Sequence, residues 1–209
     1  MNTSIEVLFT PAEFAALAQR DLSETACVVF DILRATSSMV TALAHGAQAV
    51  VPVATIPEAL AWKERDPDVL LAGERDGLRI GAALTGGVEF DLGNSPREFV
   101  PERVRGRTIV MTTTNGTRAL QACRPAAHVW VGAFLNLSAV VEALRHVQPR
   151  HLLVVCGGTI ERAAFEDALA AGALCEAVWE LYREGEVLDS VLLALEAWCR
   201  HANDVAAGL

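Results

Sequence analysis

The sequence predicts an α/β protein in which a mostly parallel sheet carries helices on both faces, and two observations support this. Short apolar runs alternate with amphipathic segments almost throughout the 209 residues, and this order is typical of βαβ units. The apolar runs, such as Cys27–Phe30 and Leu152–Cys156, have the length and unbroken hydrophobicity of buried parallel strands. No linker or shift in composition interrupts the alternation, so we expect a single α/β domain over residues 1–209.

Each element follows from the spacing of apolar residues and from the residues that begin and end it. Proline fits the first turn of a helix and glycine fits its end, which marks Pro11 as a helix start and Gly46 as a helix end. The expected strands are Ile5–Phe9, Cys27–Asp31, Ala49–Val53, Val69–Ala72, Arg107–Thr112, Val129–Val131 and Leu152–Cys156. The expected helices are Pro11–Arg20, Thr36–His45, Pro57–Arg65, Gly116–Cys123, Leu137–Val147, Arg162–Arg183 and Leu188–Val205. Only Gly73–Arg105 lacks an apolar period, and a loop of that length in a compact domain is usually functional.

Composition and charge narrow the classes of function. The chain has 17 Lys and Arg against 26 Asp and Glu, a net charge of −9, which opposes nucleic acid and acidic membranes as partners because both attract basic surfaces. The apolar runs are far shorter than the roughly 18–20 residues of a membrane-spanning helix, and the first residues show no signal-peptide pattern. The five cysteines are odd in number and lack C-x-x-C spacing, so we expect reduced thiols in a cytoplasmic protein.

Polar residues follow four of the expected strands at their carboxyl ends. Open α/β sheets bind ligands at this edge, so we expect these segments to converge there. They are Asp31–Ser38, Gly73–Gly77, Thr112–Arg118 and Gly157–Thr159.

The run Thr112–Thr117 is the strongest candidate for an anion site. It places four threonines, Asn115 and Gly116 directly before and within a helix start. Free N–H groups and the positive end of the helix dipole attract anions there, and a glycine lets the backbone approach a ligand closely. The alternative is an ordinary helix cap, which requires only one hydroxyl.

Asp31 is the second candidate, because a carboxylate at the end of a buried strand needs a partner. It either pairs with Arg34 while Thr36 caps the next helix, or it binds a metal ion while Arg34 binds an anionic group. Glu74, Asn94 and Asp167 also have simpler interpretations, namely a solvated turn, an Asx-turn before proline and a helix-dipole contact.

The absent motifs narrow the chemistry further. The sequence contains no Walker A, G-x-G-x-x-G or G-x-S-x-G motif, which weakens ATPase, dinucleotide and serine-hydrolase interpretations. Carboxylates, arginines and a hydroxyl-rich anion site remain, and this combination suits Mg²⁺ and phosphoryl chemistry.

Five blocks of the sequence occur in the order Val28–Ser37, Ala72–Arg75, Phe90–Pro96, Thr112–Thr117 and Cys156–Asp167. Taken together, these blocks resemble the 2-phosphosulfolactate phosphatase family, and the resemblance runs from about residue 5 to about residue 205. It implies an α/β fold and the Mg²⁺-dependent hydrolysis of 2-phospho-3-sulfolactate to 3-sulfolactate and phosphate, a step toward coenzyme M. It also makes a homodimer an expectation.

The resemblance also implies roles for individual residues. Asp31, Glu74 and Asp167 would be catalytic carboxylates that hold Mg²⁺, and Arg34 would act with them on the phosphoryl group. Arg97 would hold the sulfonate or carboxylate end, and a metal-polarised water, or Asp31 itself, would attack phosphorus. The substrate-binding residues implied are Arg34, Thr36, Asn94, Arg97, Thr113, Thr114, Asn115, Gly116 and Thr117.

Two departures keep other functions open. The chain is shorter at its C-terminus than we expect of the family, which would leave a closing segment absent. The sequence shows nothing of its source, so the substrate could be another phosphorylated small acid. The alternatives are a metal-dependent lyase or isomerase acting on a small dicarboxylate and a non-enzymatic protein that binds small anions.

Overall fold

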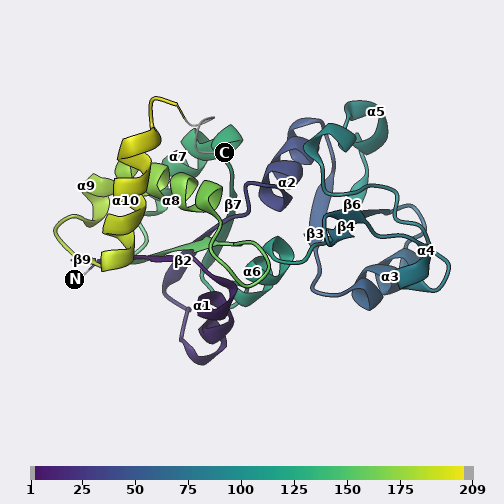
Figure 1. Cartoon of the computed structure of the whole chain (residues 1–209), viewed down its shortest axis with the longest axis horizontal. Helices are drawn as coiled ribbons and strands as arrows, with labels where there is room; N and C mark the ends of the chain where they lie inside the picture. The colour runs from purple at the N-terminus through teal and green to yellow at the C-terminus, as the bar shows by residue number, and fades with distance from the viewer. Residues whose placement is uncertain (1–2, 205–209) are drawn as a thin grey trace.

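The computed structural model describes residues 3–204, and these residues form the α/β fold with mostly parallel strands that the sequence predicts. The strands divide between two sheets, which lie side by side along the length of the molecule (Figure 1). The order of elements along the chain does not reveal this division. No helix within residues 3–204 combines the length and the apolar composition that crossing a membrane requires.

The first sheet has five parallel strands in the order β7-β2-β8-β1-β9. Alternate residues of a strand face opposite sides, so Val28 packs beneath α7, α8 and α10, whereas Val29 packs beneath α1, α2 and α6. Helices therefore cover both faces. The strands are β1 (Ser4–Leu8), β2 (Thr25–Phe30), β7 (His128–Gly132), β8 (His151–Cys156) and β9 (Glu186–Val187). The helices are α1 (Pro11–Ala15), α2 (Ala35–Ala44), α6 (Gly116–Ala122), α7 (Leu137–Val147), α8 (Phe165–Ala177) and α10 (Asp189–His201).

The second sheet has the order β3-β6-β4-β5 and is parallel except for the β4–β5 hairpin. One face packs on α3 (Ile56–Arg65), with Ala59 against the cluster that holds Val110. The other face sends Met111 into the same apolar cluster as Val29 of the first sheet. One core therefore joins the two sheets. The strands are β3 (Ala49–Pro52), β4 (Leu70–Arg75), β5 (Leu78–Arg79) and β6 (Thr108–Thr112).

The irregular segment between β4 and β6 contains β5, α4 (Ala82–Thr85), a 3₁₀ turn (Pro96–Glu98) and α5 (Pro101–Val104). Leu92 runs alongside β4: its N–H donates to the carbonyl of Leu71 at 3.0 Å, and its carbonyl accepts from Gly73 at 3.2 Å. This pairing carries the chain to the carboxyl end of β4.

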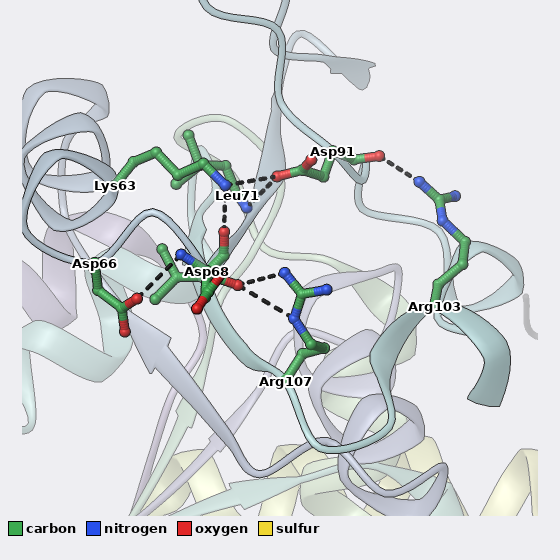
Figure 2. Close-up of polar contacts among 8 residues, drawn as sticks. Lys63, Asp66, Asp68, Leu71, Asp91, Arg103 and Arg107 are labelled. Atoms are coloured by element: carbon green, nitrogen blue, oxygen red, sulfur yellow. Dashed lines mark hydrogen bonds and ion pairs between the residues drawn. The ribbon is translucent and has the colours of Figure 1, made fainter.

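Polar contacts fasten this segment at the amino end of β4, as Figure 2 shows. The Asp91 carboxylate accepts a hydrogen bond from the N–H of Leu71 at 2.8 Å and lies 4.0 Å from Lys63 Nζ. Arg103 donates to the Asp91 carbonyl. The pairing of Leu92 with β4 then brings Asn94 to the carboxyl end of that strand.

Two predicted helices are each divided in two. The long helix expected at Arg162–Arg183 is α8 followed by α9 (Trp179–Tyr182). It begins late because Arg162 exchanges backbone hydrogen bonds with Thr159 at 2.8 and 3.0 Å. The helix expected at Pro11–Arg20 is α1 followed by a 3₁₀ turn (Ala16–Gln19).

Two further helix ends differ from expectation. Thr36 lies inside α2, whose N-cap is Arg34, so it does not cap that helix. The last helix is α10, which ends at His201, and the predicted end at Val205 lies outside the described residues.

Candidate active site

A cavity of about 380 Å³ lies where the carboxyl ends of strands from both sheets meet. Asp31 follows β2 and Gly158 follows β8 of the first sheet. In the second sheet, Glu74 is the penultimate residue of β4 and Thr114 follows β6. The polar segments that follow these strands therefore converge, as expected. The lining residues are Asp31, Leu33, Arg34, Glu74, Asp76, Gly77, Asn94, Thr114, Asn115, Gly158, Thr159 and Ile160.

A larger groove of about 780 Å³ lies between α3 and α6. Its walls are mostly apolar, and they contain none of the predicted site residues. The smaller cavity is therefore the candidate for chemistry.

Asp31 sits at the base of the cavity with its backbone and carboxylate both fixed. The hydroxyl of Thr36 accepts from the Asp31 N–H at 3.0 Å and donates to the Asp31 carbonyl at 2.9 Å, while Asp31 Oδ1 accepts from the N–H of Ala35 at 3.1 Å. Burial is the largest cause that raises the pKa of Asp31 to about 6; the Ala35 amide opposes it, and Glu74 adds to it. Thr36, fully buried, thus positions Asp31 and does not line the cavity.

Two glycines make room for the Asp31 carboxylate. A Cβ on Gly116 would lie 2.4 Å from Asp31 Oδ2, and a Cβ on Gly157 would lie 2.9 Å from Asp31 Cβ. Both distances are shorter than atoms tolerate, so glycine is required for close approach at these positions.

We expect Gly116→Ala to destabilise the chain by about 1–3 kcal/mol, because the methyl group displaces Asp31. Urea unfolding measures the effect. Gly81→Ala is the matched control, since its Cβ would meet nothing closer than the Glu89 carboxylate at 3.6 Å. Equal behaviour of the two variants would contradict the packing argument.

Glu74 links the loop after β4 to the loop after β6 at the carboxyl end of the second sheet. Its Oε1 accepts from the N–H of Thr114 at 2.7 Å and its Oε2 accepts from the N–H of Gly77 at 2.9 Å. Arg75 braces the same place, donating to the Glu74 carbonyl at 2.6 Å and to the Thr112 hydroxyl at 3.0 Å. Burial lowers the pKa of Arg75 and Glu74 opposes that effect. No pattern in the sequence predicted this role for Arg75.

Two of the four threonines in the run Thr112–Thr117 form hydrogen bonds with each other. The N–H of Thr113 donates to the Thr117 hydroxyl at 3.0 Å, and the N–H of Thr117 donates to the Thr113 hydroxyl at 3.1 Å. Both residues are buried, and neither lines the cavity. Of the four threonines in the run, only Thr114 faces the cavity.

Asp167 is likewise not among the residues that line the cavity. It is 2% exposed, and its two oxygens accept from the N–H of Ile32 at 2.7 Å and from the N–H of Gly158 at 2.9 Å. Burial, and then the nearby Asp31, raise its pKa well above the usual range. Within residues 3–204, no three His, Cys, Asp or Glu side chains are grouped so that they could hold a metal ion. Of the three implied metal ligands, Asp31 and Glu74 share the cavity and Asp167 does not line it.

The two implied arginines are in different places. Arg34 lines the cavity, where its Nη2 donates to the Gly77 carbonyl at 3.1 Å; this contact takes the place of the ion pair with Asp31 that the sequence left open. Arg97, in the turn Pro96–Glu98, is exposed and is not among the lining residues.

The loop after β8 forms a wall of the cavity, as the predicted segment Gly157–Thr159 indicated, and this wall extends to Ile160. Asn115 Nδ2 donates to the carbonyls of Gly157 at 2.9 Å and Ile160 at 3.0 Å. Ile160 is 71% exposed and has a φ of 57°, which is an unusual conformation for a β-branched residue. The local sequence does not predict this conformation, because the residue that holds it, Asn115 at the start of α6, is distant in the chain.

The position of this cavity defines the class of protein: an α/β protein with a small, polar ligand site at the carboxyl ends of its strands. The chain belongs to the family described as 2-phosphosulpholactate phosphatase, whose family model matches residues 13–209. The five sequence blocks therefore identified the family correctly.

Three relatives, each named a probable 2-phosphosulfolactate phosphatase, illustrate the similarity. The protein of Caldanaerobacter subterraneus subsp. tengcongensis is 44% identical over 171 residues, which cover 81% of this chain and 68% of the relative. That of Thermotoga petrophila is 48% identical over 147 residues, covering 70% and 60%. That of Caldicellulosiruptor saccharolyticus is 37% identical over 201 residues, covering 94% and 80%. The chain thus spans part of the length of each relative.

Proposed function

We propose that this chain hydrolyses the phosphate ester of a small anionic acid, foremost 2-phospho-3-sulfolactate, to 3-sulfolactate and phosphate with the help of Mg²⁺. The observation that carries the proposal is the cavity where Asp31 and Glu74, from different sheets, face a common space with Arg34. The names of the relatives supply the substrate.

The charges of the cavity support the need for a cation. Its charged lining side chains are three carboxylates, Asp31, Glu74 and Asp76, and one guanidinium, Arg34. A phosphate dianion would be repelled by this excess of negative charge. Mg²⁺ is commonly held by one or two carboxylates together with substrate oxygens, and Asp31 and Glu74 fit this requirement.

When bound, Mg²⁺ supplies positive charge for the phosphoryl oxygens. Arg34 donates to the same oxygens, with its planar guanidinium matched to phosphate geometry. In the reaction, the water oxygen bonds to phosphorus, the ester P–O bond breaks, and the water proton ends on the departing hydroxyl. Asp31, whose carboxylate lines the cavity, carries that proton from the water to the leaving oxygen.

A panel of phosphorylated sulfonates and carboxylates, assayed for phosphate release with and without Mg²⁺, tests the proposal. We expect release that depends on Mg²⁺ and is fastest for a phosphosulfonate. Substrate conversion without phosphate release would instead favour a lyase or isomerase. Binding by calorimetry that is indifferent to Mg²⁺, with no turnover, would favour an anion-binding protein.

We expect Arg34→Ala to raise KM by about 10–100-fold, because a hydrogen bond to a charged group contributes about 1.5–3 kcal/mol. Steady-state kinetics over a range of substrate concentrations measure it. Arg97→Ala is the control, with a KM expected within about twofold of wild type because Arg97 is exposed and outside the lining. A larger effect at Arg97 than at Arg34 would reverse the two assignments.

We further propose a reducing, cytoplasmic setting and a homodimer. All five cysteines are free thiols and four of them are buried, which is typical of proteins from reducing compartments. The net charge of −9 makes nucleic acid an unsuitable partner. Light scattering after size exclusion tests the dimer.

A further inference from the structure

Two residues that line the cavity each carry a buried side-chain oxygen with no hydrogen-bond donor. These oxygens are Asn94 Oδ1 and Asn115 Oδ1, the buried side-chain polar atoms that lack a partner within residues 3–204. The two residues are 6% and 5% exposed, and both line the cavity. Leaving a buried acceptor unpaired costs about 1–3 kcal/mol, so two such atoms in one cavity indicate that a ligand pairs with them.

The orientation of the Asn115 amide is fixed by its neighbours. Both hydrogens of Nδ2 are used, because this atom donates to the carbonyls of Gly157 at 2.9 Å and Ile160 at 3.0 Å. Exchanging the two ends of the amide would set its oxygen against two carbonyl oxygens. The side chain of Asn115 therefore offers only an acceptor to the cavity, and a phosphate dianion, which has no donor, gains nothing from it.

The other groups in the cavity determine what pairs with these oxygens. The carboxylates of Asp31, Glu74 and Asp76 line the same space, so with the two asparagines five lining residues carry carboxylate or amide oxygens. Hard divalent cations take carboxylate and amide oxygens as ligands. In residues 3–204, no group of three His, Cys, Asp or Glu side chains could hold a metal ion. A cation in this cavity must therefore draw on other oxygens, and the two amides supply them.

We propose that the side-chain oxygens of Asn94 and Asn115 are ligands of the divalent cation in this cavity. The inference rests on the proposed function for the presence of that cation, and it moves both asparagines from phosphate binding, where the family resemblance placed them, to cation binding. Asp31 and Glu74 supply the charge of the site, and the two amides supply neutral oxygens that need no deprotonation.

Asn94 provides the cleaner test. Its backbone carbonyl accepts from the Ser38 hydroxyl at 3.0 Å, a contact that survives a change of side chain. Asn94→Asp keeps an oxygen and adds a negative charge, so we expect Mn²⁺, used as the probe without substrate, to bind at least about tenfold more tightly. Asn94→Leu removes the oxygen at similar size, and we expect Mn²⁺ to bind at least about tenfold more weakly. Calorimetry or the paramagnetic resonance of free Mn²⁺ measures both.

Asn203→Asp is the matched control, because it makes the same change of charge at an exposed residue beyond α10, and its Mn²⁺ affinity should stay within about twofold of wild type. A gain of affinity in Asn94→Asp cannot come from misfolding, so the test does not depend on Asn94→Leu folding well.

The outcomes separate this inference from the proposed phosphatase activity. Unchanged Mn²⁺ affinity in both Asn94 variants, with Mg²⁺-dependent phosphate release intact in wild type, overturns the inference alone. Shifted Mn²⁺ affinities in a chain that releases no phosphate from any substrate uphold the inference and overturn the activity. Wild-type protein that binds no Mn²⁺ overturns the inference as well.

Discussion

Replacing Asp31 by asparagine is expected to lower Mg²⁺-dependent phosphate release by at least about a thousandfold, or about 4 kcal/mol of transition-state stabilisation. Asparagine has nearly the same shape and can still accept from the N–H of Ala35, which Asp31 Oδ1 bonds at 3.1 Å. It loses the charge that holds the cation and the site that carries the proton. Steady-state phosphate release measures the loss, and circular dichroism shows that the fold persists.

Asp91→Asn is the control for this variant. Asp91 also accepts a backbone hydrogen bond, from Leu71 at 2.8 Å at the amino end of β4 (Figure 2). It is not among the residues that line the cavity. We expect its turnover to stay within about twofold of wild type. Turnover near that of wild type in Asp31→Asn would remove Asp31 from the mechanism.

The same variant tests the electrostatics of the buried carboxyl. Because the pKa of Asp31 rises from 3.8 to about 6 on folding, the folded chain holds this proton more tightly than the unfolded chain. Its stabilising contribution is fully present below about pH 3.8 and is lost as the pH rises through about 6, an effect of about 3 kcal/mol. In chelator, the unfolding free energy of Asp31→Asn relative to wild type should therefore increase by about that amount between about pH 4 and pH 7.5. A difference that does not vary with pH would show that Asp31 does not titrate in this range.

The sequence predicted which strand ends meet at the cavity better than it predicted the contacts of individual side chains. Polar residues after buried strands pointed to the strand ends that the cavity joins, since parallel strands align these ends whichever sheet they belong to. The direction of a side chain depends on partners far away in the chain. Thr113 and Thr117 look like phosphate ligands in sequence, yet they bond each other. No local pattern distinguishes these two uses of a hydroxyl.

The division into two sheets was hidden for a related reason. Alternating strands and helices specify the class of fold, but strand order depends on which apolar faces pack together. Met111 and Val29, from different sheets, share one core cluster. The cavity lies where the carboxyl ends of strands from both sheets meet. Asn94 reaches it because Leu92 pairs with β4, and the irregular sequence around Leu92 shows no strand pattern.

Asp167 provides the second large effect, on stability. We expect Asp167→Ala to lower the unfolding free energy by about 2–5 kcal/mol, because the N–H groups of Ile32 and Gly158 lose their acceptors and each unpaired buried group costs about 1–3 kcal/mol. In a chain of this size, the loss corresponds to a fall in Tm of about 5–15 °C. Asp167→Asn keeps one acceptor oxygen and should lose about half as much. Urea and thermal unfolding measure both.

Adding a chelator distinguishes whether Asp167 stabilises the fold by binding a metal ion or by accepting hydrogen bonds from the backbone. If the two amides are its only partners, the stability difference between wild type and Asp167→Ala is the same with and without chelator. A difference that chelator erases would make Asp167 a metal ligand, as the family resemblance implied. Glu166→Ala removes the neighbouring carboxylate from the same first turn of α8 and should change the unfolding free energy by less than about 0.5 kcal/mol. A comparable loss there would point to the helix dipole, because both carboxylates lie at the positive end of α8.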